Sequence, residues 1–150
     1  MAVGTLIAIL ILPSSLKKAQ VDKEVDRLCA EQGGIKVMER SQLAPEMFNK
    51  WGEPQIPYKG LTASASAPFV ISFGSEALMS SDSFFFEKIS LVRTQTEAFR
   101  QADGRVLGRA IAYSRRGGDP LGPWHPSNYD GCPTNGVKNL KNAVFFRSTH

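Results

Sequence analysis

The chain has 150 residues, of which 42% are hydrophobic and 21% charged, and its formal net charge is +4. These values are typical of one globular domain that buries its own core, and they exclude an intrinsically disordered chain. A dedicated nucleic-acid-binding protein concentrates its positive charge on one face or arm, whereas the basic residues here are mostly dispersed along the chain.

The N-terminal segment, residues 1–13, reads MAVGTLIAILILP and has no charged side chain between Ala2 and Leu12. This run is shorter than the about 20 residues of a transmembrane helix but fits the apolar region of a signal peptide. No basic residue precedes it, and neither a small-x-small cleavage pattern nor a lipidation cysteine follows it. We expect a membrane-directed anchor or export signal over residues 1–13, followed by one small domain over residues 14–150. The alternative is an apolar first element buried in a soluble core.

An amphipathic helix is expected over residues 16–30, with Ser14 and Ser15 as candidate N-caps and a Gly-Gly pair at 33–34 that ends it. Residues 35–39 alternate apolar and polar side chains and predict a short strand. Cys29 belongs to the apolar stripe of the helix and is therefore expected to be buried. The stripe follows helical spacing and consists of Val21, Val25, Leu28 and Cys29.

The middle of the chain predicts less regular structure. Residues 44–51, APEMFNKW, indicate a two-turn helix with Pro45 at its first position, and Met47, Phe48 and Trp51 on its buried face. Residues 52–68 are rich in Pro, Gly, Ser and Ala and indicate a surface loop, and residues 68–73 indicate a strand. Residues 139–147 are apolar enough for a strand or a short helix.

The clearest structural signal is a β-hairpin with strands over residues 89–100 and 106–116, joined by a two-residue turn at Asp103 and Gly104. In that register Phe99 lies opposite Gly108, where its ring covers the bare backbone. We therefore predict an α+β fold. The N-terminal hydrophobic segment runs into the amphipathic helix, which packs on a small antiparallel sheet with a long central hairpin.

The hairpin is also the most basic stretch, with seven Lys or Arg residues between positions 88 and 117. Arg109, Arg115 and Arg116 are candidate binding residues for phosphate groups or anionic lipid headgroups. The expected register divides the arginines between both faces of the hairpin, with Arg93 and Arg116 on one face and Arg109 and Arg115 on the other. No array of aromatic side chains accompanies them, as it does in single-strand binders. We therefore expect a solvated outer sheet and no nucleic-acid partner.

Residues 118–133, GDPLGPWHPSNYDGCP, have an unusual concentration of proline and glycine around Trp124, His125 and Cys132. One interpretation is a thiol enzyme with Cys132 as nucleophile and His125 as base, although no catalytic motif surrounds them. A zinc site normally shows ligand pairs at short spacing, which the chain lacks, so we expect no metal or cofactor. The structural interpretation is a rigid segment in which Trp124 packs on the sheet, and Cys132 pairs with Cys29 or remains a buried thiol. Trp124 and His125 are retained as candidate binding residues.

Two segments, VDRLCAEQGGIKVME at residues 25–39 and YSRRGGDPLGPWHPSNYDGCP at residues 113–133, carry a resemblance to a family. They resemble short, uncharacterised proteobacterial envelope proteins, exported or lipid-anchored, with L-C-A-x-x-G-G-I-K-V and G-P-W-H-P-S…C-P segments. The resemblance implies export and a relationship between Cys29 and Cys132, and it implies no catalytic residue. This chain lacks the lipidation cysteine of the lipid-anchored members.

Together these patterns predict a non-enzymatic envelope protein, either anchored in the inner membrane and facing the periplasm or exported, that acts as an accessory or interaction module. Its expected partners are the membrane, through residues 1–13, and another protein. The alternatives are a small thiol enzyme that uses Cys132 and His125, or a nucleic-acid or anionic-lipid binder that uses the arginine-rich hairpin.

Overall fold

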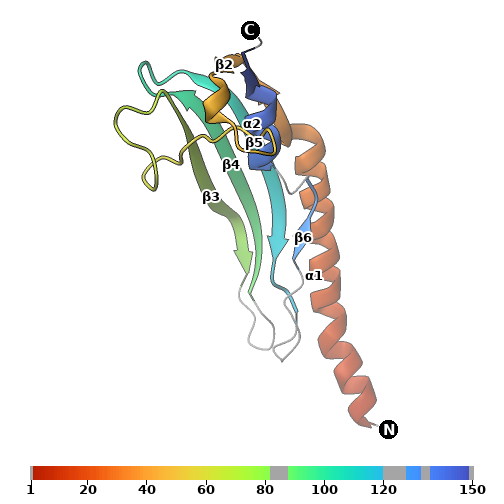
Figure 1. Ribbon diagram of the computed structural model, residues 1–150. Helices are drawn as coiled ribbons and strands as arrows, with labels where there is room; N and C mark the ends of the chain where they lie inside the picture. Colours follow the sequence, from red (N-terminus) through yellow and green to blue (C-terminus); the bar gives the residue numbers. More distant parts are fainter. Residues whose placement is uncertain (1, 82–87, 120–127, 133–135, 149–150) are drawn as a thin grey trace.

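The computed structural model describes residues 2–81, 88–119, 128–132 and 136–148, and for residues 2–15 and 81 it describes the backbone alone. In this part of the chain a long helix lies along a five-stranded antiparallel sheet, and a short helix and a two-stranded ribbon lie near the C-terminus (Figure 1). The elements are α1 (Ala2–Gln32), β1 (Gly34–Val37), β2 (Ser41–Leu43), the 3-10 turn η1 (Pro45–Met47), β3 (Phe69–Ser81), β4 (Ile89–Arg100), β5 (Val106–Arg116), β6 (Tyr129–Asp130), α2 (Gly136–Val144) and β7 (Phe145–Arg147).

The main sheet has the strand order β1-β5-β4-β3, and the short strand β6 also pairs with β5. Every pairing in this sheet is antiparallel, whereas β2 and β7 form a separate parallel ribbon. The central pair β4–β5 is the long hairpin that the sequence predicts, with the same strand boundaries. The α+β class and the antiparallel sheet with a long central hairpin are therefore confirmed.

The expected register of the hairpin is wrong by one residue. Ala98, not Phe99, lies opposite Gly108, and Phe99 pairs with Val106. The strands are joined by the loop 101–105 rather than by a two-residue turn, and a bulge next to it inserts Leu107 into β5. Such an extra residue changes the partner of every residue beyond it.

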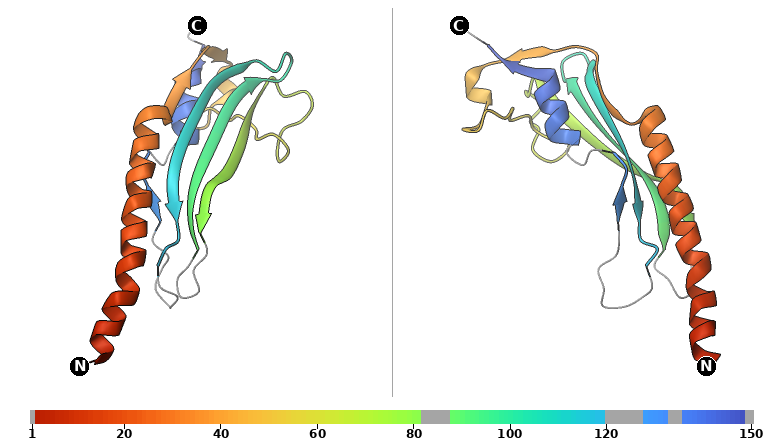
Figure 2. Two further views of the ribbon diagram at one scale, coloured as in Figure 1. Left: turned by 180° about the vertical axis from the view of Figure 1, so that it is seen from behind. Right: turned by 90° about the vertical axis from the view of Figure 1, so that its right-hand side faces the viewer.

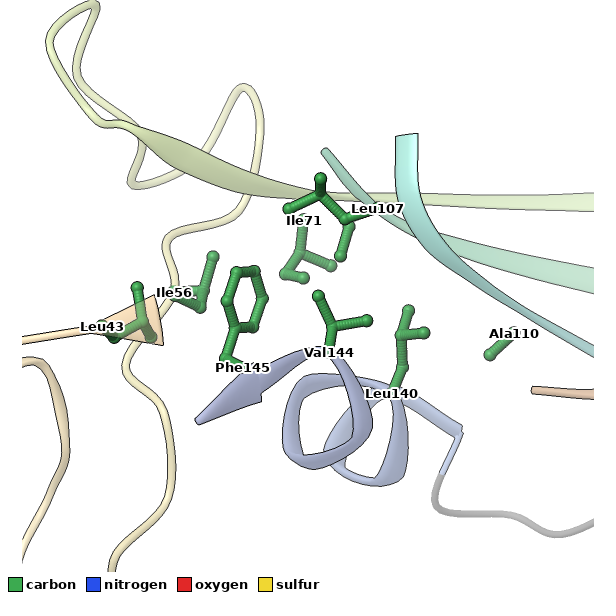
Figure 3. Close-up of a cluster of buried hydrophobic side chains, with 9 residues drawn as sticks. Leu43, Ile56, Ile71, Leu107, Ala110, Leu140, Val144 and Phe145 are labelled. Carbon is green, nitrogen blue, oxygen red and sulfur yellow. The ribbon is translucent and has the colours of Figure 1, made fainter. Parts of the chain in front are cut away.

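The two helices cover opposite faces of the sheet, which Figure 2 shows edge-on. Successive residues of a strand point to opposite faces, so Ala110 and Tyr113 of β5 lie on different sides. Tyr113 packs with α1 on one side, and Ala110 packs with α2 on the other. The α2 side is a continuous apolar cluster in which Leu140 and Val144 lie close to Ile71 (Figure 3). The sheet is therefore the middle layer of three.

Gly108 makes the close contact between α2 and β5 possible. A Cβ atom at this position would lie 2.5 Å from a methyl group of Val144 and 3.0 Å from Leu140. The helix α2, rather than the ring of Phe99, therefore covers the glycine. Only glycine, which has no side chain, allows α2 to pack this closely against β5.

Three expected elements differ from those observed. Helix α1 begins at Ala2 and runs through Pro13, so no cap at residues 14–15 starts it. Strand β3 extends to Ser81, well beyond the expected end at residue 73. The expected helix over residues 44–51 is reduced to the single turn η1.

The shortened helix has a local cause in Asn49. Its side-chain oxygen accepts hydrogen bonds from the amides of Trp51 (3.0 Å) and Glu53 (2.9 Å), which turns the chain away from a helical path. Met47 and Phe48 still pack against the α2-side cluster, as expected. Trp51 is 73% exposed, so its predicted burial is wrong.

Candidate functional site

The feature that links the two ends of the chain is a disulfide between Cys29 on α1 and Cys132 just after β6. The Cα atoms of the two residues are 5.5 Å apart, although the residues are separated by 103 positions in the sequence. The predicted pairing is therefore confirmed, and the alternative of two unpaired thiols is wrong. Cys132 is buried, and its sulfur accepts a hydrogen bond from the Tyr113 amide at 3.3 Å.

Two glycines allow the helix and the β6 segment to come within bonding distance. A Cβ atom at Gly33 would lie 2.9 Å from the sulfur of Cys132, and one at Gly131 would lie 2.5 Å from a methyl group of Val25. Because a side chain at either position would push the two segments apart, both glycines are required by the packing around the disulfide. From the sequence, the glycine pair at 33–34 is expected only to end the helix, and this second role of Gly33 is not predicted.

Apolar packing surrounds the disulfide on the face of the sheet that α1 covers. Val25 is fully buried, and Val21 and Leu28 are nearly so. These side chains meet Leu91 and Tyr113 of the sheet, together with Ile89. The predicted amphipathic stripe of the helix is thus the surface that packs on the sheet, and the helix from Val21 to Cys29 belongs to the folded domain.

A row of polar contacts runs beside this apolar stripe along about 21 Å of helix. The first three helix residues of the row are spaced i, i+4 and i+8, which places them on one side of α1. Together with the disulfide, these contacts fix both the rotation and the axial position of the helix on the sheet. The pairs are Lys18–Asp119 (2.6 Å), Asp22–Arg115 (2.6 Å), Asp26 with the Tyr129 hydroxyl (2.7 Å) and Gln32 with the Tyr113 hydroxyl (3.0 Å).

The Tyr129 hydroxyl donates to the Asp26 carboxylate, and this hydrogen bond raises the pKa of Tyr129 above its ordinary value. Arg115 lies in the same row and is almost fully buried, with 3% of its side chain exposed. Its guanidinium donates to Asp22 and to the Gly117 carbonyl. A buried guanidinium needs such partners. Arg115 therefore links β5 to α1 through Asp22, and its charge is not available to bind a ligand.

The two other arginines proposed as binding residues are also paired with carboxylates. Arg109 lies 2.6 Å from Glu97 on the neighbouring strand, and Arg116 lies 3.5 Å from Asp130 of β6. Carboxylates likewise pair with the remaining arginines of the hairpin: Arg93 with Glu76, Arg100 with Glu39 and Asp103, and Arg105 with Glu39. The positive charge that the sequence concentrates in the hairpin is therefore neutralised locally.

The expected division of these arginines between the two faces also needs correction. Arg93 pairs with Tyr113, and Arg115 pairs with Leu91, so Arg93, Arg109 and Arg115 share the face that α1 packs on. Arg116 lies on the other face. The one-residue difference in register is the physical reason, because it exchanges the faces of one strand relative to the other.

Of the remaining candidate binding and catalytic residues, the structure describes only Cys132. Trp124 and His125 fall within residues 120–127, outside the part of the chain that the structure describes. The sulfur of Cys132 is bonded to Cys29, so the oxidised protein has no thiolate at this position to act as a nucleophile. Among the described residues, no group of three or more His, Cys, Asp or Glu side chains is arranged to hold a metal ion.

The polar row on α1 is the part of the site that sequence reasoning missed. Its only signal in the sequence is the alternation of Lys18, Asp22 and Asp26 at helical spacing beside the apolar stripe. That pattern also fits a solvated face, and the partners of these residues lie far away in the sequence. In the part of the chain whose side chains are described, no helix combines the length and the apolar composition that crossing a membrane requires.

Comparisons with protein-family models, with curated proteins and with solved structures found no match to this chain. The disulfide, the contacts around it and the exposed surfaces are therefore the features that bear on its function.

Proposed function

We propose that this chain is a non-enzymatic interaction module of the cell envelope, exported or tethered to the inner membrane on its periplasmic side. The observation that carries the proposal is the disulfide between Cys29 and Cys132. Disulfides form and persist in oxidising compartments such as the periplasm, and they are rare in the reducing cytosol. The buried position of Cys132 supports a structural bond rather than one that is broken and re-formed in a reaction.

The proposed tether is the apolar run of residues 1–13. Residues 2–12 belong to the same helix as Cys29, and the N-terminal end of this helix extends past the sheet (Figure 2). In the tethered form the apolar run enters the membrane and the following turns carry the domain outside it. Lys17 and Lys18 would then lie near the headgroups, where anionic lipids attract them.

The non-enzymatic part of the proposal is supported by the surroundings of the two sulfur atoms. A reactive cysteine needs a low pKa, which a nearby positive charge or a helix N-terminus supplies. Here the disulfide lies among Val25, Leu28 and Tyr113, near the C-terminal end of α1. These side chains stabilise the packing of α1 on the sheet, and they do not lower the pKa of a cysteine thiol.

The test is to locate the full chain in a bacterial host and to determine the state of its sulfur atoms there. We expect it in the membrane or periplasmic fraction, with both cysteines unreactive to a maleimide until a reductant is added. The intact mass of the isolated chain then distinguishes an anchor from a cleaved signal. A soluble cytosolic protein with two free thiols would contradict the proposal.

A matched pair of variants tests the role of the apolar run. Ile9→Arg places a charge in the middle of the run and should move the protein to the soluble cytosolic fraction, where the disulfide does not form. Ile9→Val keeps the run apolar and should leave the location and the disulfide unchanged. Equal distribution of the two variants would contradict the tether or signal role of residues 1–13.

A further inference from the structure

Strand β3 forms one edge of the main sheet and pairs with β4 on its inner side (Figure 1). Among the described residues, those that hydrogen-bond to its outer side do so near one end, at Ile71. There the Ile71 amide donates to the Pro57 carbonyl at 2.9 Å, and the Ile71 carbonyl accepts from the Lys59 amide at 2.8 Å. Beyond this point residues 73–80 are all exposed, and none of the described residues bonds to their outer edge.

The polar groups of this outer edge follow from the bonds at Ile71. Backbone groups alternate between the two edges of a strand, so those of Phe73, Ser75 and Ala77 point outward like those of Ile71. We name residues 73–77 the open edge. Each of its outward residues presents one N–H and one C=O group that bond to no backbone group of the described residues.

The open edge lacks most of the devices that protect natural sheet edges. Lysine, proline and inward-pointing charges normally prevent such an edge from pairing with another chain. Strand β3 contains neither lysine nor proline, and its only charged residue is Glu76. A bulge near Leu78 ends the regular segment. The open edge is thus a regular template for one further strand.

The side chains along the open edge differ between its two faces. On the α2 side, Phe73 is 60% exposed and forms one wall of a cavity of about 270 Å³, with Ile35 and Val137 as other walls. The floor of this cavity is made of small side chains from β4 and β5, namely Thr94, Thr96, Ala110 and Ala112. On the α1 side the edge is polar: Glu76 pairs with Arg93 of β4 at 2.9 Å, and 57% of its side chain remains exposed to solvent.

We propose that the open edge binds an extended peptide segment of a partner protein, which adds a strand to the sheet. This proposal deepens the interaction role proposed above and rests on it. Residues directly opposite each other in an antiparallel pair share a face. The added segment would therefore place apolar side chains beside Phe73 and Ala77 and a basic side chain beside Glu76. Alternating apolar and basic residues are the recognisable chemistry of the partner segment.

A second copy of this chain fits the open edge less well. If two β3 strands paired antiparallel about Ser75, the end of the partner strand would enter the space beside Ile71 that residues 57–59 already fill. Pairing about Glu76 would instead set two carboxylates directly opposite each other, which is destabilising. A short segment with a free end avoids both conflicts.

The experiment uses the full-length, oxidised protein and two synthetic peptides of equal composition. One peptide alternates, Lys-Val-Lys-Val-Lys-Val-Lys, and the other is blocked, Lys-Lys-Lys-Lys-Val-Val-Val. With the alternating peptide, we expect the amides of Phe73, Ser75 and Ala77 to exchange with solvent at least about tenfold more slowly. The amides of Gly74 and Glu76 already face β4, and their exchange should not change. The blocked peptide should have no effect on any of these amides.

Two variants test the same edge and keep the backbone hydrogen bonds between β3 and β4. Ser75→Pro removes one outward N–H group and should lower the affinity for the alternating peptide at least about tenfold. Ser66→Pro, in the exposed loop before β3, is the matched control and should bind normally. Glu76→Lys keeps every backbone group, although it removes the ion pair with Arg93. It should also weaken binding at least about tenfold, because the new lysine repels the basic side chain of the peptide. Circular dichroism of each variant shows whether the fold is intact.

Several outcomes would overturn the proposal. These are equal effects of the two peptides, slowed exchange away from the open edge, or unchanged binding by both folded edge variants. Slowed exchange at Phe73, Ser75 and Ala77 in a dimer without peptide would identify a second copy as the occupant and would also overturn it. Peptide binding is measured on purified protein, whereas the location in the cell envelope is measured by fractionation. A negative result in one experiment can therefore be distinguished from a negative result in the other.

Discussion

Removal of the disulfide should cost this protein a large part of its stability. The double substitution Cys29→Ala and Cys132→Ala opens a loop whose ends are 103 residues apart. On the chain-entropy model, closing a loop of about 100 residues stabilises the folded state by about 4.7 kcal/mol. A domain of ordinary stability has only about 5–15 kcal/mol in total. We therefore expect a variant that is barely folded at 37 °C.

The contributions of the cross-link and of the Cys132 sulfur to the free energy of unfolding can be separated in urea. This requires three forms of the protein: oxidised, reduced and doubly substituted. Reduction of the native chain breaks the cross-link but keeps the sulfur of Cys132 as acceptor for the Tyr113 amide. The double variant also loses this acceptor, which should add about 1 kcal/mol. With a typical urea slope of about 1–3 kcal/mol per molar, reduction should lower the unfolding midpoint by about 1.5 M or more. Circular dichroism at each urea concentration gives the midpoints.

A loss below about 1 kcal/mol on reduction would refute this reasoning. It would mean that α1 and the β6 segment stay together in the unfolded chain without the bond, so that the cross-link restricts little. A reduced form more stable than the oxidised one would contradict the structural role of the disulfide altogether. The native, oxidised protein measured in the same buffer without reductant is the reference for both comparisons.

Three further predictions concern single contacts. Asp22→Asn removes the carboxylate beside the buried Arg115 guanidinium and should lower the free energy of unfolding in urea by about 1–3 kcal/mol, less than for a fully buried pair because Asp22 is 28% exposed. Gly108→Ala places a methyl group against α2 and should lower the unfolding free energy by about 1–3 kcal/mol, measured by calorimetry. Lys138 holds the pKa of Glu53 below its ordinary value, so stability from this pair is present at neutral pH and lost as acid protonates Glu53. Lys138→Met should raise the NMR titration midpoint of the Glu53 carboxyl.

Matched controls exist for the substitutions of Asp22 and Gly108. Glu24 also pairs with an arginine but on the exposed side of α1, so Glu24→Gln should change stability far less than Asp22→Asn. Gly74 has no atom within 4 Å of an added Cβ, so Gly74→Ala should be tolerated where Gly108→Ala is not. Equal losses within either pair would contradict the packing and burial arguments. An unchanged Glu53 midpoint in Lys138→Met would contradict the assigned cause of its pKa.

The parts of the fold that the sequence predicted depend on local signals. The Asp-Gly pair at residues 103–104 and the long alternating strands around it were enough to locate the hairpin. The register was missed because of the bulge at Leu107, whose carbonyl accepts hydrogen bonds from the amides of Met38 and Glu39, a contact between segments far apart in the sequence. Trp51 was misplaced because helical spacing does not reveal that the Asn49 side chain competes for backbone amides.

The candidate site was predictable only in part for the same reason. Cys29 could be assigned from spacing alone to the side of its helix that packs on the sheet, although it is partly rather than fully buried there. Its bond to Cys132 needed the resemblance and the compartment argument, because sequence spacing does not fix a partner 103 residues away. The ion pair between Asp22 and Arg115 could not be predicted from the helical spacing of Asp22, since a solvated face shows the same pattern of charges. The open edge of β3 likewise emerged only once the strand order was known.

The long separation of the two cysteines also constrains how the protein is made. During synthesis Cys29 emerges well before Cys132, with the whole β4–β5 hairpin between them. The native bond can therefore close only after Cys132 and the 103-residue stretch that leads to it have been delivered. An oxidising enzyme that acts on the emerging polypeptide has no intramolecular partner to offer Cys29 until then. The Cys29 thiol therefore stays unpaired within its own chain until Cys132 has been synthesised, which makes formation of the native bond a late event in the production of the domain.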